Sequence, residues 1–150
     1  MPATPEFVGR TFALAQPYEV EAAALRSFAA AVGATAPACF DAAAARALGY
    51  RDIVAAPTFA AVIAQATEAL YVADPAAGID FTRVVHAEER ISTVRPLIAG
   101  DRVNATVHVV SVTTRATICL VTTRTDLTCA DDGGPIAAVW STLAIRPGDE

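Results

Sequence analysis

The chain has 150 residues, of which 54% are hydrophobic, 18% are charged and only 7% are aromatic. This length predicts a single domain over residues 1–150, and such a domain buries roughly two-thirds of the surface that the unfolded chain exposes. The net charge of −5 argues against a basic surface of the kind that binds nucleic acid, because such surfaces neutralise phosphates with Lys and Arg.

The first half of the chain is predicted to be helical. One helix has apolar residues at i, i+3, i+4 and i+7, the spacing of a single helical face: Leu25, Phe28, Ala29 and Val32. Gly33 follows this face, and helices commonly end at a left-handed glycine. A short second helix is predicted from Asp41, a favourable N-cap, to Leu48, with Gly49 ending it.

The third predicted helix is the longest. It is expected to begin near Pro57, because proline is tolerated in the first turn of a helix, and to stop at Asp74-Pro75. Its apolar face consists of five residues at helical spacing: Phe59, Val62, Ile63, Ala66 and Leu70. Because the helix is almost entirely apolar, we expect it to be buried.

From Arg83 onward the sequence is rich in β-branched residues and alternates with a period of two, which is typical of strands. Four strands are predicted, over Val84–Val94, Val103–Val112, Ala116–Leu127 and Ile136–Ile145. Their short connections predict an antiparallel meander. A further short strand is expected near Val8–Phe12, at the sheet edge. A sheet that faces one long apolar helix is an α+β arrangement.

Nothing in the sequence indicates a membrane or an oxidising compartment. It has no run of about 20 apolar residues, and the first six residues lack the basic and apolar regions of a signal peptide. The three cysteines, which have no CxxC spacing, are Cys39, Cys119 and Cys129. We therefore expect a cytoplasmic protein with no membrane insertion, no metal site and no cofactor.

Seven short motifs carry a resemblance to a known family through their order and spacing. They are Phe7-Val8-Gly9-Arg10, Pro17-Tyr18-Glu19-Val20, Leu48-Gly49-Tyr50, Ala55-Ala56-Pro57-Thr58-Phe59, Val85-His86-Ala87-Glu88, Arg95-Pro96-Leu97 and Ala99-Gly100-Asp101. Over nearly the whole chain they resemble the hot-dog fold of MaoC-like (R)-hydratases and (3R)-hydroxyacyl-thioester dehydratases. In particular, the chain is similar to the N-terminal dehydratase subfamily and to the non-catalytic, acyl-chain-holding subunit of bacterial heterodimeric (3R)-hydroxyacyl-ACP dehydratases.

The loop that carries the catalytic residues of this family is degenerate here. Active members resemble one another in a Gly-Asp-x-Asn-Pro-x-His-x-Asp loop, and the equivalent stretch is residues 33–41. Ala34 replaces the Asp, Ala36 the Asn and Cys39 the His. Dehydration of a 3-hydroxyacyl thioester needs a base for the C2 proton and an acid for the departing hydroxyl, and such groups contribute roughly 10²–10⁴-fold. The resemblance therefore implies that the chain alone is inactive.

A second part of the family's machinery is also missing. Active members have an Ala-His-Gly-type turn at the start of the central helix, where a backbone N–H helps bind the thioester carbonyl. The aligned stretch here is Ala55-Ala56-Pro57, and Pro57 has no N–H to donate. Loss of one such donor costs about 2.7–4 kcal/mol in other enzymes.

These observations predict a non-catalytic, acyl-chain-binding subunit of a dehydratase in fatty-acid metabolism. A MaoC-like partner with an intact loop is expected to supply the catalytic residues by pairing at an unpaired sheet edge. The substrate is expected to be an acyl-CoA or an acyl-ACP, and Arg51, Arg95 and Arg102 are candidates to meet an acidic carrier. The expected wall of the acyl tunnel is Cys39, Phe40, Pro57, Thr58, Phe59, Val62 and Ile63.

Two alternatives stay open. One is a homodimeric acyl-thioester-binding module that has no catalytic partner. The other is an active enzyme with relocated residues, either a hot-dog thioesterase or a dehydratase that works through His86. Gln65 and Glu68 are candidates for the thioesterase, although they are also expected on an outward or interface-facing edge of the third helix. His86 is expected to share a polar strand face with Glu88 and Arg90.

Two further residues have ordinary interpretations. Cys39, which the resemblance places beside the substrate, is a candidate nucleophile, but a free cysteine is more often a small, buried and inert residue. His108 alternates with Asn104 and Thr106 on a polar strand face, so we expect it to be solvated.

Overall fold

The structure of the protein is a computed structural model that describes residues 3–146. Three α-helices are present in this range: α1 (Ala22–Ala31), α2 (Ala42–Ala47) and α3 (Phe59–Val72). Short 3₁₀ turns are η1 (Pro5–Phe7), η2 (Pro37–Cys39), η3 (Pro75–Ala77) and η4 (Phe81–Arg83). The six strands are β1 (Thr11–Ala13), β2 (Tyr18–Glu19), β3 (Val84–Thr93), β4 (Arg102–Arg115), β5 (Ile118–Cys129) and β6 (Pro135–Ile145).

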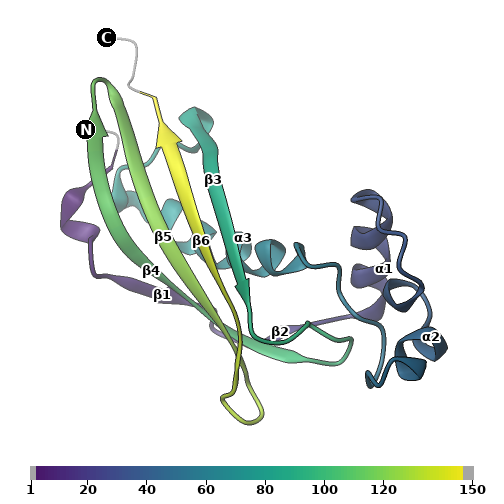
Figure 1. The fold of residues 1–150 in the computed structure, drawn as a ribbon. Helices are drawn as coiled ribbons and strands as arrows, with labels where there is room; N and C mark the ends of the chain where they lie inside the picture. The colour runs from purple at the N-terminus through teal and green to yellow at the C-terminus, as the bar shows by residue number, and fades with distance from the viewer. Residues whose placement is uncertain (1–2, 147–150) are drawn as a thin grey trace.

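All six strands form one antiparallel sheet in the order β1-β4-β5-β6-β3, with β2 also paired to β4. α3 lies against one face of this sheet, and α1 and α2 lie together beyond its end (Figure 1). The predicted α+β arrangement and the four long strands are confirmed. No helix within residues 3–146 is long and apolar enough to cross a membrane.

The position of β3 differs from the predicted meander. β4, β5 and β6 follow one another as expected, but β3 pairs with β6 and not with its successor β4. The connection between β3 and β4 is held elsewhere: Ala55 N donates to Leu97 O, and Ala99 N donates to Ile53 O. Because this connection pairs with the segment before α3, it crosses under the sheet, and β3 becomes an edge strand.

α3 forms the core with only one of its faces. The residues that it buries against the sheet include Phe59, Ala60, Ile63, Ala64 and Tyr71. They follow the i, i+4 rows of the helix. Ala66 is exposed and Leu70 is 40% exposed, so the predicted apolar face was wrong at these two positions. The expectation that the helix is buried holds for one side only, because the sheet covers that side of α3 and leaves an apolar side open.

The first two helices begin and end largely as predicted. The Asp41 carboxylate accepts hydrogen bonds from the backbone N–H groups of Ala43 and Ala44, which satisfies donors that the first turn of α2 leaves free. Gly33 has a φ of +71°, the left-handed conformation that ends α1. Val32, predicted on the apolar face of α1, is 50% exposed because it is the C-cap residue beyond the packed turns.

Candidate functional site

The loop between α1 and α2 holds the positions at which the family's catalytic residues are expected. Cys39 is buried, Ala34 is half-buried and Ala36 is exposed. The neighbouring Ala38 O accepts a hydrogen bond from Val54 N, which ties the loop to the segment that leads into α3. The loop therefore lies beside the start of α3, but it brings no carboxylate or imidazole to that place. Its remaining acidic residue, Asp41, caps α2.

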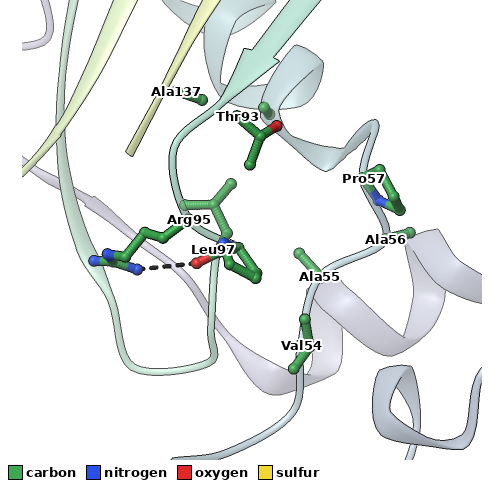
Figure 2. Close-up of a pocket in the computed structure, with 10 residues that line it drawn as sticks. Val54, Ala55, Ala56, Pro57, Thr93, Arg95, Leu97 and Ala137 are labelled. Carbon is green, nitrogen blue, oxygen red and sulfur yellow. Dashed lines mark hydrogen bonds between the residues drawn. The ribbon is translucent and has the colours of Figure 1, made fainter. Parts of the chain in front are cut away.

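A cavity of about 310 Å³ lies next to this loop, at the N-terminal end of α3. It is lined by Val54, Ala55, Ala56, Pro57, Ala60, Thr93, Arg95, Pro96, Leu97 and Ala137. Figure 2 shows the segment before α3 on one side of the cavity, and the end of β3 with the connection that follows it on the other. The backbone bonds that pull this connection under the sheet therefore also build one wall of the cavity.

The chemistry of the cavity wall is almost entirely apolar. Among the described residues that line it, none carries a carboxyl, an imidazole or a thiol. Arg95 is the charged residue in the set, and its guanidinium points away from the space, where it donates to Pro96 O (Figure 2). The hydrogen bond to Asp101 raises the pKa of Arg95, so this guanidinium stays protonated. A substrate in the cavity would contact apolar side chains, and the wall would offer it no group suited to proton transfer.

Asp101 fixes the Arg95 side of the cavity. Its side chain is only 4% exposed and accepts hydrogen bonds from Arg95 Nη1 at 2.8 Å, Ile98 N at 2.9 Å and Arg51 Nη2 at 3.0 Å. Burial raises the pKa of Asp101, but the hydrogen bonds from Arg95, Ile98 and Arg51 outweigh burial and lower it overall. A buried carboxylate with several donors is a stable anchor for the turn that precedes β4.

The three arginines expected to meet an acidic carrier are already paired within the chain. Arg51 and Arg95 bind Asp101. Arg102 Nε lies 3.1 Å from Glu19 Oε1, and its Nη1 lies 3.3 Å from Asp131 Oδ1. These arginines hold neighbouring loops together, and a carrier would have to compete with those partners.

The structure separates the seven residues predicted to form the tunnel wall. Pro57 lines the cavity, whereas Phe59 and Ile63 are fully buried in the core between α3 and the sheet. The others are not among the cavity's lining residues: Cys39 is buried, Phe40 and Val62 are half-buried, and Thr58 is exposed. The sequence prediction missed the wall formed by Thr93, Arg95, Pro96 and Leu97, although the last three form one of the motifs singled out in the sequence.

A second polar cluster lies near the other end of α3. Glu68 is 5% exposed, and its Oε1 accepts a 2.5 Å hydrogen bond from Thr123 Oγ1 on β5. Its Oε2 lies 3.5 Å from Nε2 of His86 on β3. The prediction placed Glu68 on an outward or interface-facing edge, but the structure buries its carboxylate under the sheet. The sequence feature that could have indicated the burial of Glu68 is Thr123, whose hydroxyl lies on the inward face of a predicted strand.

A β-bulge in β3 decides which side chains meet Glu68. The pairing of β3 with β6 shifts register between His86 and Glu88, so the strict alternation of faces is broken there. His86 faces α3, whereas Glu88 and Arg90 lie on the opposite face, where the Arg90 guanidinium is 4.2 Å from the Trp140 ring. The prediction that His86 shares a face with Glu88 and Arg90 was therefore wrong, because an extra residue was inserted into the strand.

An apolar groove of about 340 Å³ adjoins the Glu68–His86 pair at the sheet edge. Its lining residues come from α3, η4, β3 and β6 and are Gln65, Glu68, Ala69, Val72, Ala73, Phe81, Val84, His86 and Leu143. Phe81 is 71% exposed. Within residues 3–146, no set of three or more His, Cys, Asp or Glu side chains is arranged to hold a metal ion.

His108 lies on the outer, convex face of the sheet. Its Nε2 is 3.1 Å from Asp126 Oδ2, and Arg124 also pairs with that carboxylate. The predicted alternation with Asn104 and Thr106 holds in β4, and the side chain is partly exposed. His108 is thus one member of a surface charge network and lies on the face opposite to α3.

An antiparallel sheet wrapped around a single long helix, with a cavity at the start of that helix, defines a hot-dog-fold protein. A family model for the FAS1-like dehydratase domain region matches residues 6–139, and the chain belongs to this family. It is 42% identical to a UPF0336 protein of Leifsonia xyli subsp. xyli, covering 100% of this chain and 99% of that protein. A UPF0336 protein of Clavibacter michiganensis is 41% identical and covers 99% of each chain.

Solved structures confirm the fold and the MaoC-like relationship. The C-terminally truncated HadBC (3R-hydroxyacyl-ACP dehydratase) complex of Mycobacterium tuberculosis is similar, with a TM-score of 0.83, 27% identity and coverage of 96% of this chain and 99% of that chain. A MaoC-like dehydratase has a TM-score of 0.86 and 28% identity over 95% of this chain and 43% of its own. The MaoC-like dehydratase of Rhodospirillum rubrum, at 22% identity and a TM-score of 0.70, shares the fold.

Proposed function

We propose that this chain is the non-catalytic, acyl-chain-binding subunit of a (3R)-hydroxyacyl-thioester dehydratase, and that a MaoC-like subunit with an intact Asp/His loop performs the chemistry. The observation that carries the proposal is the composition of the cavity at the start of α3. Its described wall offers no group that takes up or releases a proton near neutral pH, although the elimination of water requires both steps. A wall of this kind is suited to holding an acyl chain.

The size of the wall residues supports an acyl-binding role. Ala55, Ala56, Ala60 and Ala137 line the cavity, and their small side chains leave the space of about 310 Å³ between α3 and the end of β3. Apolar burial contributes about 0.8 kcal/mol for each methylene group. An acyl chain held there would gain affinity with its length until the cavity is full.

The free edge of the sheet supports the pairing with a second chain. Within residues 3–146, no strand pairs with the outer side of β3, and most of its residues are exposed. A ten-residue edge strand is a template for another chain. A hot-dog partner that adds its own edge strand would extend the sheet and bring its catalytic loop near this chain's cavity. The HadBC complex has a chain similar to this one, which is consistent with such an assembly.

The Glu68–His86 pair favours a second candidate function. A carboxylate that orients an imidazole beside an apolar groove is a common arrangement for general base catalysis, so the pure chain could hydrolyse or hydrate an acyl thioester there. The pair cannot serve the cavity at the start of α3, because Ala60 and Glu68 are separated by about 12 Å along the helix axis. The second function therefore requires the substrate to bind in the groove at the sheet edge.

The deciding experiment measures hydration of a trans-2-enoyl-CoA by three samples. They are the purified chain, a MaoC-like protein with an intact Asp/His loop, and the mixture of the two. The proposal predicts activity in the mixture well above the sum of the separate proteins. Activity of the chain alone that is lost in both Glu68→Ala and His86→Ala would favour the second function. A mixture no more active than the MaoC-like protein by itself would contradict the proposed function.

A further inference from the structure

Two carboxylates lie on the helix-facing side of the open sheet edge. Glu68 comes from α3, and Glu89 from β3, two residues beyond the bulge. Both line the same small recess, together with Gln65, Thr125 and Ser141. Partial burial raises the pKa of Glu89, and the Glu68 carboxylate raises it further, whereas His86 lowers it. The two acidic groups are therefore close enough to repel each other.

Little positive charge compensates this pair inside the chain. Among the described residues, the basic side chain in contact with Glu68 is His86, which is 41% exposed, and no arginine pairs with Glu68 or Glu89. The chain contains no lysine at all. Ser141 adds a buried hydroxyl that has no hydrogen-bond partner among the described residues. The cluster is therefore acidic, and its polar groups are only partly satisfied.

The surface around this cluster is suited to association. The groove beside Glu68 is apolar, and two further apolar residues of α3, Ala66 and Leu70, are exposed. The unpaired edge of β3 borders the same region. Glu68 is already buried, and a chain that docks here would remove the exposed Glu89 from water beside it. A buried carboxylate is costly unless it gains a partner of opposite charge.

A second copy of this chain is a poor occupant of the edge. In an antiparallel pair, residues directly opposite each other point to the same face. If β3 pairs with its own copy about the middle of the strand, either Glu88 meets Glu88 or Glu89 meets Glu89. In the Glu89 register, Glu88 faces Arg90 on the solvated convex face, but both copies of Glu68 and Glu89 then gather on the helix side. Like charges directly opposite are destabilising.

We infer that the β3 edge selects a different hot-dog chain over a second copy of this one, and that this partner places a basic side chain, Arg or Lys, against Glu68 and Glu89. The inference rests on the heteromeric pairing in the proposed function and adds the chemistry that determines the partner. An arginine suits the position well, because its planar guanidinium donates to two carboxylates at once and is weakly hydrated.

The test uses the variants Glu89→Gln and Glu68→Gln and the natural chain, and it measures two kinds of association for each of them. The first is self-association, measured by sedimentation equilibrium, and the second is binding to the MaoC-like protein with the intact loop, measured by calorimetry at low and high salt. Both substitutions are expected to strengthen self-association, and to weaken binding to the partner about 10-fold with a smaller salt dependence. Glu21→Gln removes the same charge far from β3 and is the matched control.

The outcomes separate this inference from the proposed function. Opposite effects on self-association and on partner binding support the inference, even if the mixture shows no hydratase activity. An active mixture whose affinity is the same for Glu89→Gln as for Glu21→Gln overturns it while leaving the proposed function intact. A tight dimer of the natural chain that is insensitive to salt and to both substitutions also overturns it. If Glu68→Gln fails to fold, the exposed Glu89→Gln variant decides.

Discussion

Glu68 and His86 meet between α3 and the edge strand β3, with 3.5 Å between Oε2 and Nε2. The contact depends on one extra residue in β3, because the bulge before Glu88 turns His86 toward the helix. It also depends on Thr123, whose hydroxyl holds the other carboxylate oxygen of Glu68. One irregularity in a strand thus places the partly exposed His86 against the buried Glu68, beside the sheet edge where we propose that a partner chain docks.

Removal of the Asp101 carboxylate is expected to destabilise the fold. Asp101→Ala leaves Arg95, Arg51 and Ile98 N without their shared acceptor and frees the turn that forms one wall of the cavity. Because both guanidinium groups are partly exposed, we expect a loss of roughly 2–3 kcal/mol in the free energy of unfolding. Urea denaturation measures it. Asp131→Ala, which removes an exposed partner of Arg102, should cost less than about 1 kcal/mol.

The same carboxylate is expected to make stability depend on acid pH. The folded pKa of Asp101 is lowered, so in the acid range the unfolded chain binds more protons at this residue than the folded chain does. The stabilisation is complete above the ordinary aspartate pKa of about 4 and is lost as the pH falls through the lowered value. Denaturation midpoints from pH 6 to pH 2 should therefore fall more steeply for the natural chain than for Asp101→Asn. Parallel curves would show that Asp101 is not responsible.

Tyr71→Phe is expected to stabilise the protein. The Tyr71 ring is fully buried among Phe7 and Phe12, and its hydroxyl has no hydrogen-bond partner among the described residues. Removal of an unsatisfied buried hydroxyl should gain about 1 kcal/mol in the free energy of unfolding. Thermal denaturation at pH 7 measures this gain, and a loss of stability in Tyr71→Phe would indicate that the hydroxyl is satisfied.

Tyr71 also provides a spectroscopic signature at high pH. Burial, with smaller contributions from Cys119 and Glu68, raises its pKa from the ordinary 10.0 to about 12. Since the folded pKa is raised, the stability due to the neutral phenol is present below pH 10 and is lost as the pH approaches 12. Ultraviolet titration of the natural chain should show a late phenolate step, and this step should be absent in Tyr71→Phe. A titration curve identical in the two proteins would contradict the assignment.

Filling the cavity at the start of α3 is expected to change the acyl-chain preference of the mixture. Ala60 is 4% exposed and lines that cavity, so Ala60→Leu places a larger side chain where the acyl chain is proposed to lie. We expect kcat/KM to fall about 10-fold or more for long enoyl-CoA substrates and to change little for short ones, since overpacking excludes the distal methylene groups. Ala30→Leu, at an exposed position of α1, is the control. Equal losses for long and short substrates would argue against an acyl role for this cavity.

Features with a local physical cause were predictable from the sequence. Asp41 caps α2 and Gly33 ends α1 because capping and left-handed φ depend on a few neighbouring residues. The long strands of the second half follow from alternation with a period of two. The sequence also shows directly that position 34 carries no carboxylate and position 39 no imidazole, because they are Ala34 and Cys39. That these positions are empty catalytic sites stays a prediction.

Other features required the tertiary structure because they join residues far apart in the chain. Asp101 gathers Arg51 and Arg95 across a connection whose course depends on pairing with residues 53–55. β3 lies at the edge of the sheet because that connection leads under the sheet to β4, which is not its neighbour. Sequence periodicity fixes which face a side chain takes only while the alternation is unbroken, so the bulge that turns His86 toward Glu68 was decided by the packing of β3 on β6 and α3.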